Sequence, residues 1–330
     1  MVKTVNQAFR VFLDDVVNLD SEKTKTARSS RDNLISNINS FSGDGDFFVV
    51  YDEKILNFGS FARRTKIRPL DDIDIMICFS GEATRTYEMY GDEAIIYGSA
   101  SDKSNNLLDQ GYRLNSTKVI NRLISKLSLL NDYKKAEMHK NMEAATLQLK
   151  SYEWNFDIVP CFYTVHDFYL IPNGKGSWKK TDPRIDRDRV TTLNQKFNGN
   201  LLSLIRLIKY WNIINSAKTI SSYLLEAMVL DRYDKLVASE SNWWIDLQFR
   251  DTMEDLSNSI LKPVYDPKGI QGDINDLTNE EKVSVSNSMT DAYEKAKLAI
   301  SLEFSDTEGR QRDSINKWRE VFGDKFPQYE

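Results

Sequence analysis

Alternating apolar and polar positions predict two β-strands near the middle of this chain. In residues 72–79, isoleucines alternate with aspartates at the start of an otherwise apolar run. Residues 154–163 form a second run, rich in β-branched and aromatic side chains, that contains Asp157. Successive side chains of a strand point to opposite faces, so Asp72 and Asp74 must share one face while the isoleucines share the other.

The remaining sequence shows helical and loop patterns. Apolar residues at helical spacing predict one long helix within residues 1–40, broken once, and further helices at 117–130, 201–214, 221–230 and 280–299. Ser116 is the candidate N-cap of the helix at 117–130. We expect short strands at 47–51 and 144–149 and a helical turn at 52–57. Polar composition predicts loops at 81–105 and 172–189, the second anchored by Trp178.

Composition and charge exclude several classes of protein. The formal net charge of −5 argues against a protein that coats nucleic acid, because that task demands a broad basic face. Basic residues do gather at 21–32, where the alternatives are nucleic-acid contact and a solvated helix face. We expect the solvated face and no nucleic-acid activator.

The expected localisation follows from the apolar runs of the sequence, and the expected cysteine and zinc chemistry follows from its few cysteines and histidines. No apolar run approaches 18 residues and the N-terminus lacks a signal-peptide core, so we expect a cytoplasmic protein without a membrane segment. Cys78 and Cys161 are expected to be small buried hydrophobes without a disulfide. His139 and His166, the two histidines, give no support for a zinc site.

The paired carboxylates are the main candidate for chemistry. Asp72 and Asp74 on one sheet face would repel each other unless a hard divalent cation lay between them. The alternative is a solvated strand edge. Gly59 and Ser60, which eleven residues separate from Asp72, favour the cation site, because a glycine lets the backbone approach a ligand closely and the Ser60 N–H and hydroxyl suit phosphate oxygens.

The motifs together resemble a known family. The order of Gly59-Ser60, the Asp72-Ile73-Asp74 strand and a later FDIVP strand at 156–160 resembles the nucleotidyltransferase fold of the DNA polymerase β superfamily. Within it, residues 59–75 are similar to the bacterial CD-NTases, relatives of cyclic GMP-AMP synthase and of bacterial dinucleotide cyclases. One departure is Arg64, where many relatives carry glycine.

The resemblance implies a fold and a division into lobes. The expected class is α+β, with a polymerase β-like mixed sheet, a long N-terminal helix and a helical C-terminal lobe. Residues 1–190 would form the catalytic lobe, which includes the N-terminal helix. Residues 191–330 would form the helical lobe that closes the active-site cleft.

The resemblance also implies two-metal phosphoryl transfer from nucleoside triphosphates, ATP and GTP included. Asp72, Asp74 and Asp157 would hold two Mg²⁺ ions, with Mn²⁺ as the alternative ion. Asp157 would also assist removal of the acceptor hydroxyl proton, and pyrophosphate would leave. The product would be a cyclic di- or oligonucleotide.

Two motifs in the second half are also similar to the family. They are the LIKYWN helix that contains Lys209 and the Ser222-Tyr223 pair at the start of the next helix. By resemblance, Lys209 and Ser222 contact the donor triphosphate and Tyr223 stacks on the donor base, which suits a mobile charge, a helix N-terminus and an aromatic ring. For Tyr223 the alternative is a core aromatic.

The family's biology implies a partner. A monomeric enzyme would release a cyclic nucleotide that activates a separate effector protein in antiphage (CBASS) signalling. The alternatives are a nucleotidyltransferase that makes a linear product or modifies RNA ends or small molecules, and a catalytically inactive nucleotide-binding module.

Overall fold

The computed structural model describes residues 1–45, 47–82, 85–98, 105–215, 217–237 and 243–330. The chain forms two compact units, each described here by itself. The helical unit comprises Met1–Asp20, Thr65–Pro69 and Asp188–Glu330, and the sheet unit comprises Ser21–Arg64 and Leu70–Arg187. The first twenty residues and the segment Thr65–Pro69 thus belong with the C-terminal helices. The division into functional lobes at residue 190 stays a prediction.

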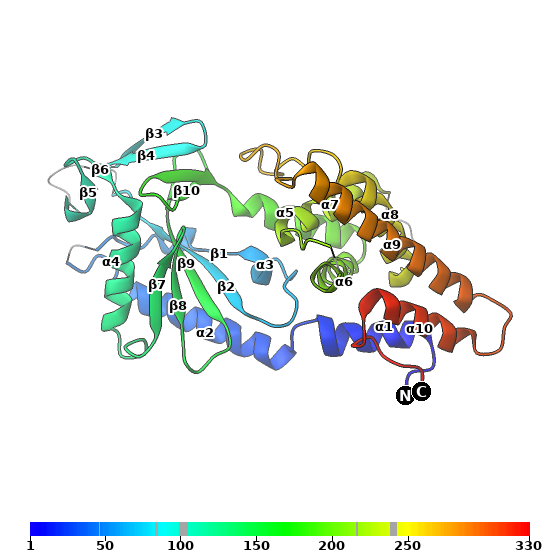
Figure 1. Cartoon of the computed structure of the whole chain (residues 1–330). Helices are drawn as coiled ribbons and strands as arrows, with labels where there is room; N and C mark the ends of the chain where they lie inside the picture. Colours follow the sequence, from blue (N-terminus) through cyan, green and yellow to red (C-terminus); the bar gives the residue numbers. More distant parts are fainter. Residues whose placement is uncertain (46, 83–84, 99–104, 216, 238–242) are drawn as a thin grey trace. The chain divides into compact units, whose positions relative to one another are not determined.

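Among its described residues, the sheet unit is built on one mixed, 11-stranded sheet. Its strands are β1 (Leu56–Phe58), β2 (Asp72–Phe79), β3 (Thr86–Tyr90), β4 (Glu93–Tyr97), β5 (Leu108–Asp109), β6 (Arg113–Leu114), β7 (Glu137–Asn141), β8 (Ala144–Gln148), β9 (Asn155–Tyr163), β10 (Tyr169–Pro172) and β11 (Trp178–Thr181). The long strands β2 and β9 run parallel (Figure 1). The other edge of β9 pairs with β8 at its start and with β10 at its end.

Helices complete the sheet unit. They are α2 (Ser21–Asn39), the short α3 (Gly59–Ala62) and α4 (Ser116–Leu129), with 3₁₀ turns at Asp52–Lys54 and Asn105–Leu107. Figure 1 shows α4 beside the β7–β8 hairpin and α3 at the junction of β1 and β2. Trp178 is fully buried, and its indole N–H donates to the Leu114 carbonyl at 2.8 Å. This contact confirms Trp178 as an anchor.

The helical unit contains α1 (Val5–Phe12), a π-helical turn (Leu13–Val17), most of α5 (Pro183–Lys196), α6 (Leu201–Ile214), α7 (Ser222–Lys235), α8 (Ile245–Ser259), α9 (Asn279–Glu303) and α10 (Arg310–Phe322). Blue α1 lies beside red α10, and the termini lie close together (Figure 1). Phe9, Trp318 and Phe322 pack ring against ring within 6 Å. Each such buried side chain contributes about 1.5–3 kcal/mol through removal of apolar surface from water.

Several sequence-based element predictions are confirmed. The N-terminal helical region is interrupted once, at residues 18–20, and β2, β8, β9, α6 and α7 form where the patterns predicted them. The helix at Ser116–Leu129 also forms, but its cap was misassigned. Asn115 is the N-cap, because its side chain accepts from the Lys118 backbone N–H at 3.1 Å and Ser116 is already helical.

The predictions that failed concern short strands. The expected loop at 81–105 contains the β3–β4 hairpin, which turns at Gly91, while residues 83–84 and 99–104 lie outside the described ranges. The expected loop at 172–189 contains β11 and the start of α5. The expected strand at 47–51 is a single bridge from Val50 to Phe79. The helical turn expected at 52–57 forms as a 3₁₀ turn at Asp52–Lys54, but residues 56 and 57 belong to β1. Short strands are weakly marked in a sequence, because their stability depends on packing against the strands that they pair with.

Candidate active site

The register of β2 and β9 brings the three predicted carboxylates to one face of the sheet. Asp74 lies directly opposite Asp157, and Asp72 lies directly opposite Asn155. Residues in register on neighbouring strands point to the same side, and residues two apart on one strand do so as well. All three aspartates therefore share a face, while Ile73 and Ile75 are buried on the other.

A row of residues in register, polar from Asp74 onward, crosses the sheet at the level of Asp74. From β1 to β7 the residues in register are Phe58, Asp74, Asp157, Thr146 and His139. Within this row the Thr146 hydroxyl donates to Oδ1 of Asp157 at 2.6 Å. The Asp157 carboxylate therefore lies between a second carboxylate on one side and a hydroxyl donor on the other.

Further along the same two strands, this face becomes apolar. Met76, Cys78, Val159 and Cys161 follow the aspartates and pack in a buried cluster with Tyr169. Both cysteines are free and fully buried, which confirms the expectation of small buried hydrophobes. Burial raises the pKa of the Cys161 thiol, so it stays protonated at neutral pH. The chemistry of this face is confined to its acidic end.

Gly59 is required by its closeness to Asp74. It has a φ of 70° and begins α3 immediately after Phe58, which pairs with Asp74. A Cβ atom on residue 59 would overlap Oδ2 of Asp74 and lie 2.5 Å from its Cγ. Only glycine leaves room for this carboxylate and adopts the backbone conformation without strain. Ser60 follows in the same turn and is half-buried.

The donor set fits a divalent metal that binds together with its substrate. Carboxylate oxygens suit Mg²⁺ and Mn²⁺, and Mg²⁺ is usually held by one or two carboxylates plus phosphate and water oxygens. Within the described ranges, no three His, Cys, Asp or Glu side chains form a ready-made metal cluster. The Asp74 carboxylate itself occupies the space that a Cβ of residue 59 would fill. The residues present are therefore compatible with metal binding on this face.

Comparisons with known proteins decide the family. No protein-family profile matches the chain. A probable cyclic nucleotide synthase of Bacillus cereus strain VD146 is 46% identical over 340 residues, and the match covers 100% of both chains. The chain belongs to the bacterial CD-NTase family. It is thus a nucleotidyltransferase related to cyclic nucleotide synthases.

Solved structures agree with the fold of this CD-NTase. CdnC of Escherichia coli MS115-1, solved with ATP, matches with a TM-score of 0.71 at 17% identity over 98% of each chain. Apo DncV of Vibrio cholerae matches with a TM-score of 0.72 at 12% identity over 99% of this chain and 97% of DncV. These matches confirm the expected polymerase β-like fold.

Lys209 of the CD-NTase lies inside the helical unit. Its side chain is only 5% exposed, and its ammonium lies 3.3 Å from Oε2 of Glu226 and donates to the Thr65 carbonyl at 3.0 Å. The Thr65 hydroxyl donates to the same Glu226 oxygen at 2.8 Å. A contact between Lys209 and a triphosphate stays a prediction.

Ser222 and Tyr223 form the first turn of α7. Ser221 caps this helix by accepting from the Leu224 N–H at 3.2 Å, and Ser222 is exposed. Tyr223 is half-buried, outside the apolar core of the helical unit, and its hydroxyl donates to Oδ1 of Asp266 at 2.8 Å. The Lys268 ammonium lies over the Tyr223 ring, 4.3 Å from its centroid. The roles of Ser222 and Tyr223 toward a donor nucleotide stay predictions.

Asp266 organises the loop beneath Tyr223. Burial by itself raises the pKa of this carboxyl, but the Lys268 ion pair, the Tyr223 hydroxyl and the Gln271 N–H outweigh it and lower the pKa to about 2. The Lys268 ammonium lies 2.9 Å from the Asp266 carboxylate. Sequence reasoning missed Asp266 and Lys268, since their only signal was a turn-forming Asp-Pro pair.

Thr146 was also missed. Its strand was predicted, and alternation could have placed Thr146 and Gln148 on one face of that strand. The sequence could not give the register that sets Thr146 opposite Asp157, because that register depends on pairing with a strand formed by later residues.

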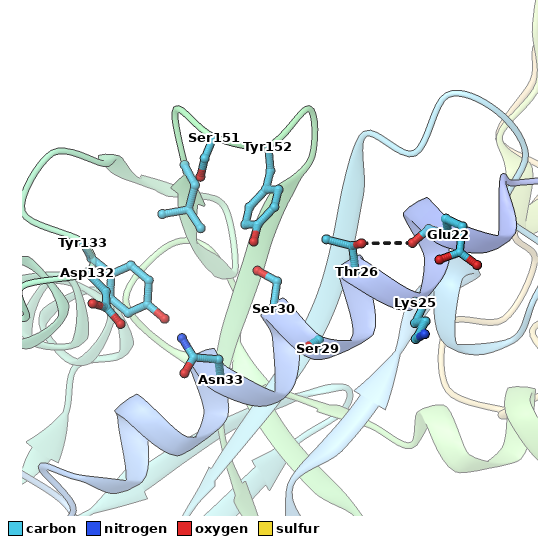
Figure 2. A pocket seen from close by; sticks show the side chains of 11 residues that line it. Glu22, Lys25, Thr26, Ser29, Ser30, Asn33, Asp132, Tyr133, Ser151 and Tyr152 are labelled. Atoms are coloured by element: carbon cyan, nitrogen blue, oxygen red, sulfur yellow. Dashed lines mark hydrogen bonds between the residues drawn. The ribbon is translucent and has the colours of Figure 1, made fainter.

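The sheet unit also contains a polar cavity of about 740 Å³ (Figure 2). Polar side chains of α2, among them Thr26, Ser30 and Asn33, form one wall, and Tyr133 and Tyr152 form the other. None of the predicted site residues of the CD-NTase lines this cavity.

Among the described helices, none is long and apolar enough to cross a membrane.

Proposed function

We propose that this CD-NTase synthesises a cyclic di- or oligonucleotide from nucleoside triphosphates, with release of pyrophosphate at each transfer. The observation that carries the proposal is the direct pairing of Asp74 with Asp157 on the face that also bears Asp72. Family membership and the fit of Gly59 against the Asp74 carboxylate support it further.

The proposed metal ligands are the three carboxylates. Asp72 and Asp74 would hold one Mg²⁺ and, with Asp157, a second one, and Mn²⁺ would serve as well. Bound metal would supply charge stabilisation at the transferred phosphate and lower the pKa of the acceptor hydroxyl. Asp157 would receive the hydroxyl proton at Oδ2, because its Oδ1 already accepts the hydrogen bond from Thr146.

The remaining predicted residues would bind the donor. The Ser60 N–H and hydroxyl would contact phosphate oxygens, which the side-chain-free Gly59 allows to come close to the backbone. Lys209 and Ser222 would contact the triphosphate and Tyr223 would stack on the base. For Lys209 this binding requires the ammonium to exchange part of its contact with Glu226 for phosphate oxygens.

We also propose a biological role on the basis of family membership. The CD-NTase would act as a cytoplasmic monomer, and its cyclic product would activate a separate effector protein in antiphage (CBASS) signalling. The effector would recognise the product and need not contact the enzyme.

The test is incubation with labelled ATP, GTP, CTP and UTP, followed by phosphatase treatment and mass spectrometry. A phosphatase-resistant product whose mass equals that of a closed ring of nucleoside monophosphates is expected. A phosphatase-sensitive ladder, or label found only on added RNA ends or small molecules, would favour the other nucleotidyltransferase reactions. Absence of any transfer with Mg²⁺ and with Mn²⁺ would favour an inactive nucleotide-binding module.

A further inference from the structure

The Thr146 side chain forms a hydrogen bond with a carboxylate of the candidate site. It lies on β8 directly opposite Asp157 and is 6% exposed. The distance of 2.6 Å from its Oγ1 to Oδ1 of Asp157 lies in the range of a hydroxyl bound to a charged carboxylate. This hydrogen bond links β8 to the acidic face of the sheet.

The surroundings of Thr146 direct its hydroxyl to this carboxylate. Strand β8 pairs with β7 on one edge and with β9 on the other, so its backbone N–H and C=O groups form hydrogen bonds with these two strands. Threonine is β-branched, and its χ1 is restricted in a strand. The hydroxyl therefore points along a fixed direction, on the face that carries Asp157.

The Asp157 carboxylate needs such a restraint. The terminal torsion of an aspartate is broad, so one carboxylate can present its oxygens in many orientations. A hydrogen bond to Oδ1 fixes the carboxylate plane and leaves Oδ2 for other ligands. Partners that orient a metal ligand in this way typically change metal affinity or activity by about 10- to 100-fold when they are removed.

We propose that Thr146 is a positioning residue that holds the Asp157 carboxylate so that Oδ2 faces the metal and the acceptor hydroxyl. This inference rests on the proposed function, because it assigns Thr146 a task in that reaction. Thr146 itself does not touch the nucleotide or take a proton.

The test compares Thr146→Val, Thr146→Ser and Thr164→Val with the wild-type chain. Valine keeps the shape of threonine without the hydroxyl, and serine keeps the hydroxyl. Thr164 is a matched control, since it is also 6% exposed and lies in the sheet unit, but its hydroxyl donates to a backbone carbonyl, that of Phe168, at 3.0 Å. Mn²⁺ binding is measured by electron paramagnetic resonance with a nonhydrolysable ATP analogue, and turnover by pyrophosphate release.

We expect Thr146→Val to weaken Mn²⁺ binding and to lower kcat, each by about 10- to 100-fold, with a smaller change in the KM for ATP. Thr146→Ser should stay within about 3-fold of the wild type in both measurements, because the donor is kept. Thr164→Val should lower the melting temperature and leave Mn²⁺ binding unchanged. If Thr146→Val does not fold, Thr146→Ala replaces it with the same expectation.

Three results would overturn the inference. They are a folded Thr146→Val variant that binds Mn²⁺ as the wild type does, a Thr146→Ser variant as impaired as the valine variant, and an equal loss in Thr164→Val. A wild-type chain without transferase activity would instead refute the proposed function. If the wild type is active, Asp157→Asn is inactive and Thr146→Val is unimpaired, only the role of Thr146 is refuted.

Discussion

The acidic end of the sheet unit and the polar network of the helical unit both contain predicted ligands of the nucleotide, but they are built differently. In the sheet unit, backbone register places Asp74 beside Asp157. In the helical unit, Lys209 is held by Glu226 and Thr65 inside the protein. The comparison shows that like charges on a strand pair can stay half-exposed, where water screens their repulsion, whereas a buried charge needs a partner of opposite charge.

The difference in burial has consequences for mutation. Asp72, Asp74 and Asp157 are each partly exposed, so replacing one of them by a neutral isostere leaves no buried charge behind. The side chains of Lys209 and Glu226 are 5% and 3% exposed, and removing one takes the opposite charge away from the other inside the protein. The first region should therefore respond mainly in activity and the second mainly in stability.

The largest expected effect is that of Asp74→Asn on turnover. The substitution removes a charge from the proposed metal site with little change in volume, so we expect a loss of about 10³-fold or more in pyrophosphate release with an unchanged melting temperature. Asp92→Asn, at the exposed turn between β3 and β4, is the control and should keep full activity. Turnover near the wild-type level in Asp74→Asn would contradict the assigned site.

The second prediction concerns Lys209. Lys209→Met should lower the free energy of unfolding by about 3–5 kcal/mol, because it removes the ammonium that pairs with the buried Glu226 carboxylate. The double variant Lys209→Met with Glu226→Met should regain most of this stability, measured by urea denaturation. If Lys209 also binds phosphate, the stable double variant should still show a KM for ATP raised by about 10-fold or more. An unchanged KM would leave Lys209 a structural residue.

The third prediction sharpens the role of Gly59. Alanine at this position would force the Asp74 carboxylate aside, and a misplacement of about 1 Å in an active site can lower turnover by about 10²-fold. Gly91→Ala is the matched control, since Gly91 has a φ of 63° but open space where its Cβ would lie. Both variants should lose stability through the positive φ, Gly59→Ala should lose more because of the overlap with Asp74, and only Gly59→Ala should lose turnover. Equal turnover in the two variants would contradict the assigned contact.

The smallest predicted effect is the pH dependence that Asp266 contributes to stability. Its pKa of about 2 in the folded chain lies below the ordinary value of 3.8, so the ionised carboxyl stabilises the fold above pH 4 and this contribution disappears as the pH falls toward 2. After solvent screening the contribution is about 1–2 kcal/mol. Asp266→Asn should flatten the fall of melting temperature between pH 4 and pH 2, and an unaltered slope would exclude this role.

The sequence predicted the parts of the fold that repeat a local pattern. The alternation of Asp72, Ile73 and Asp74 and the apolar spacing of α6 are properties of single segments, and both elements form as predicted. The β3–β4 hairpin had a local signal that the sequence analysis missed, because two β-prone runs are joined there by the two-residue turn Gly91-Asp92. Strand β11 was harder to predict, because it is short and pairs with β4, far along the chain.

The candidate site shows the same division. The shared face of Asp72 and Asp74 follows from strand geometry alone. The alignment of Asp157 with Asp74, the hydrogen bond from Thr146 and the burial of Lys209 against Glu226 depend on register and packing between separate segments. These features decide which way the site residues point, and a single sequence does not show which segments pair or pack together.

The most direct test of the central claim is anomalous diffraction from crystals of the CD-NTase grown with Mn²⁺ and a nonhydrolysable ATP analogue. The account predicts Mn²⁺ peaks about 2.1 Å from carboxylate oxygens of Asp72, Asp74 and Asp157, bridged to the analogue's phosphates. Peaks at other residues, with the analogue bound away from these three aspartates, would contradict it.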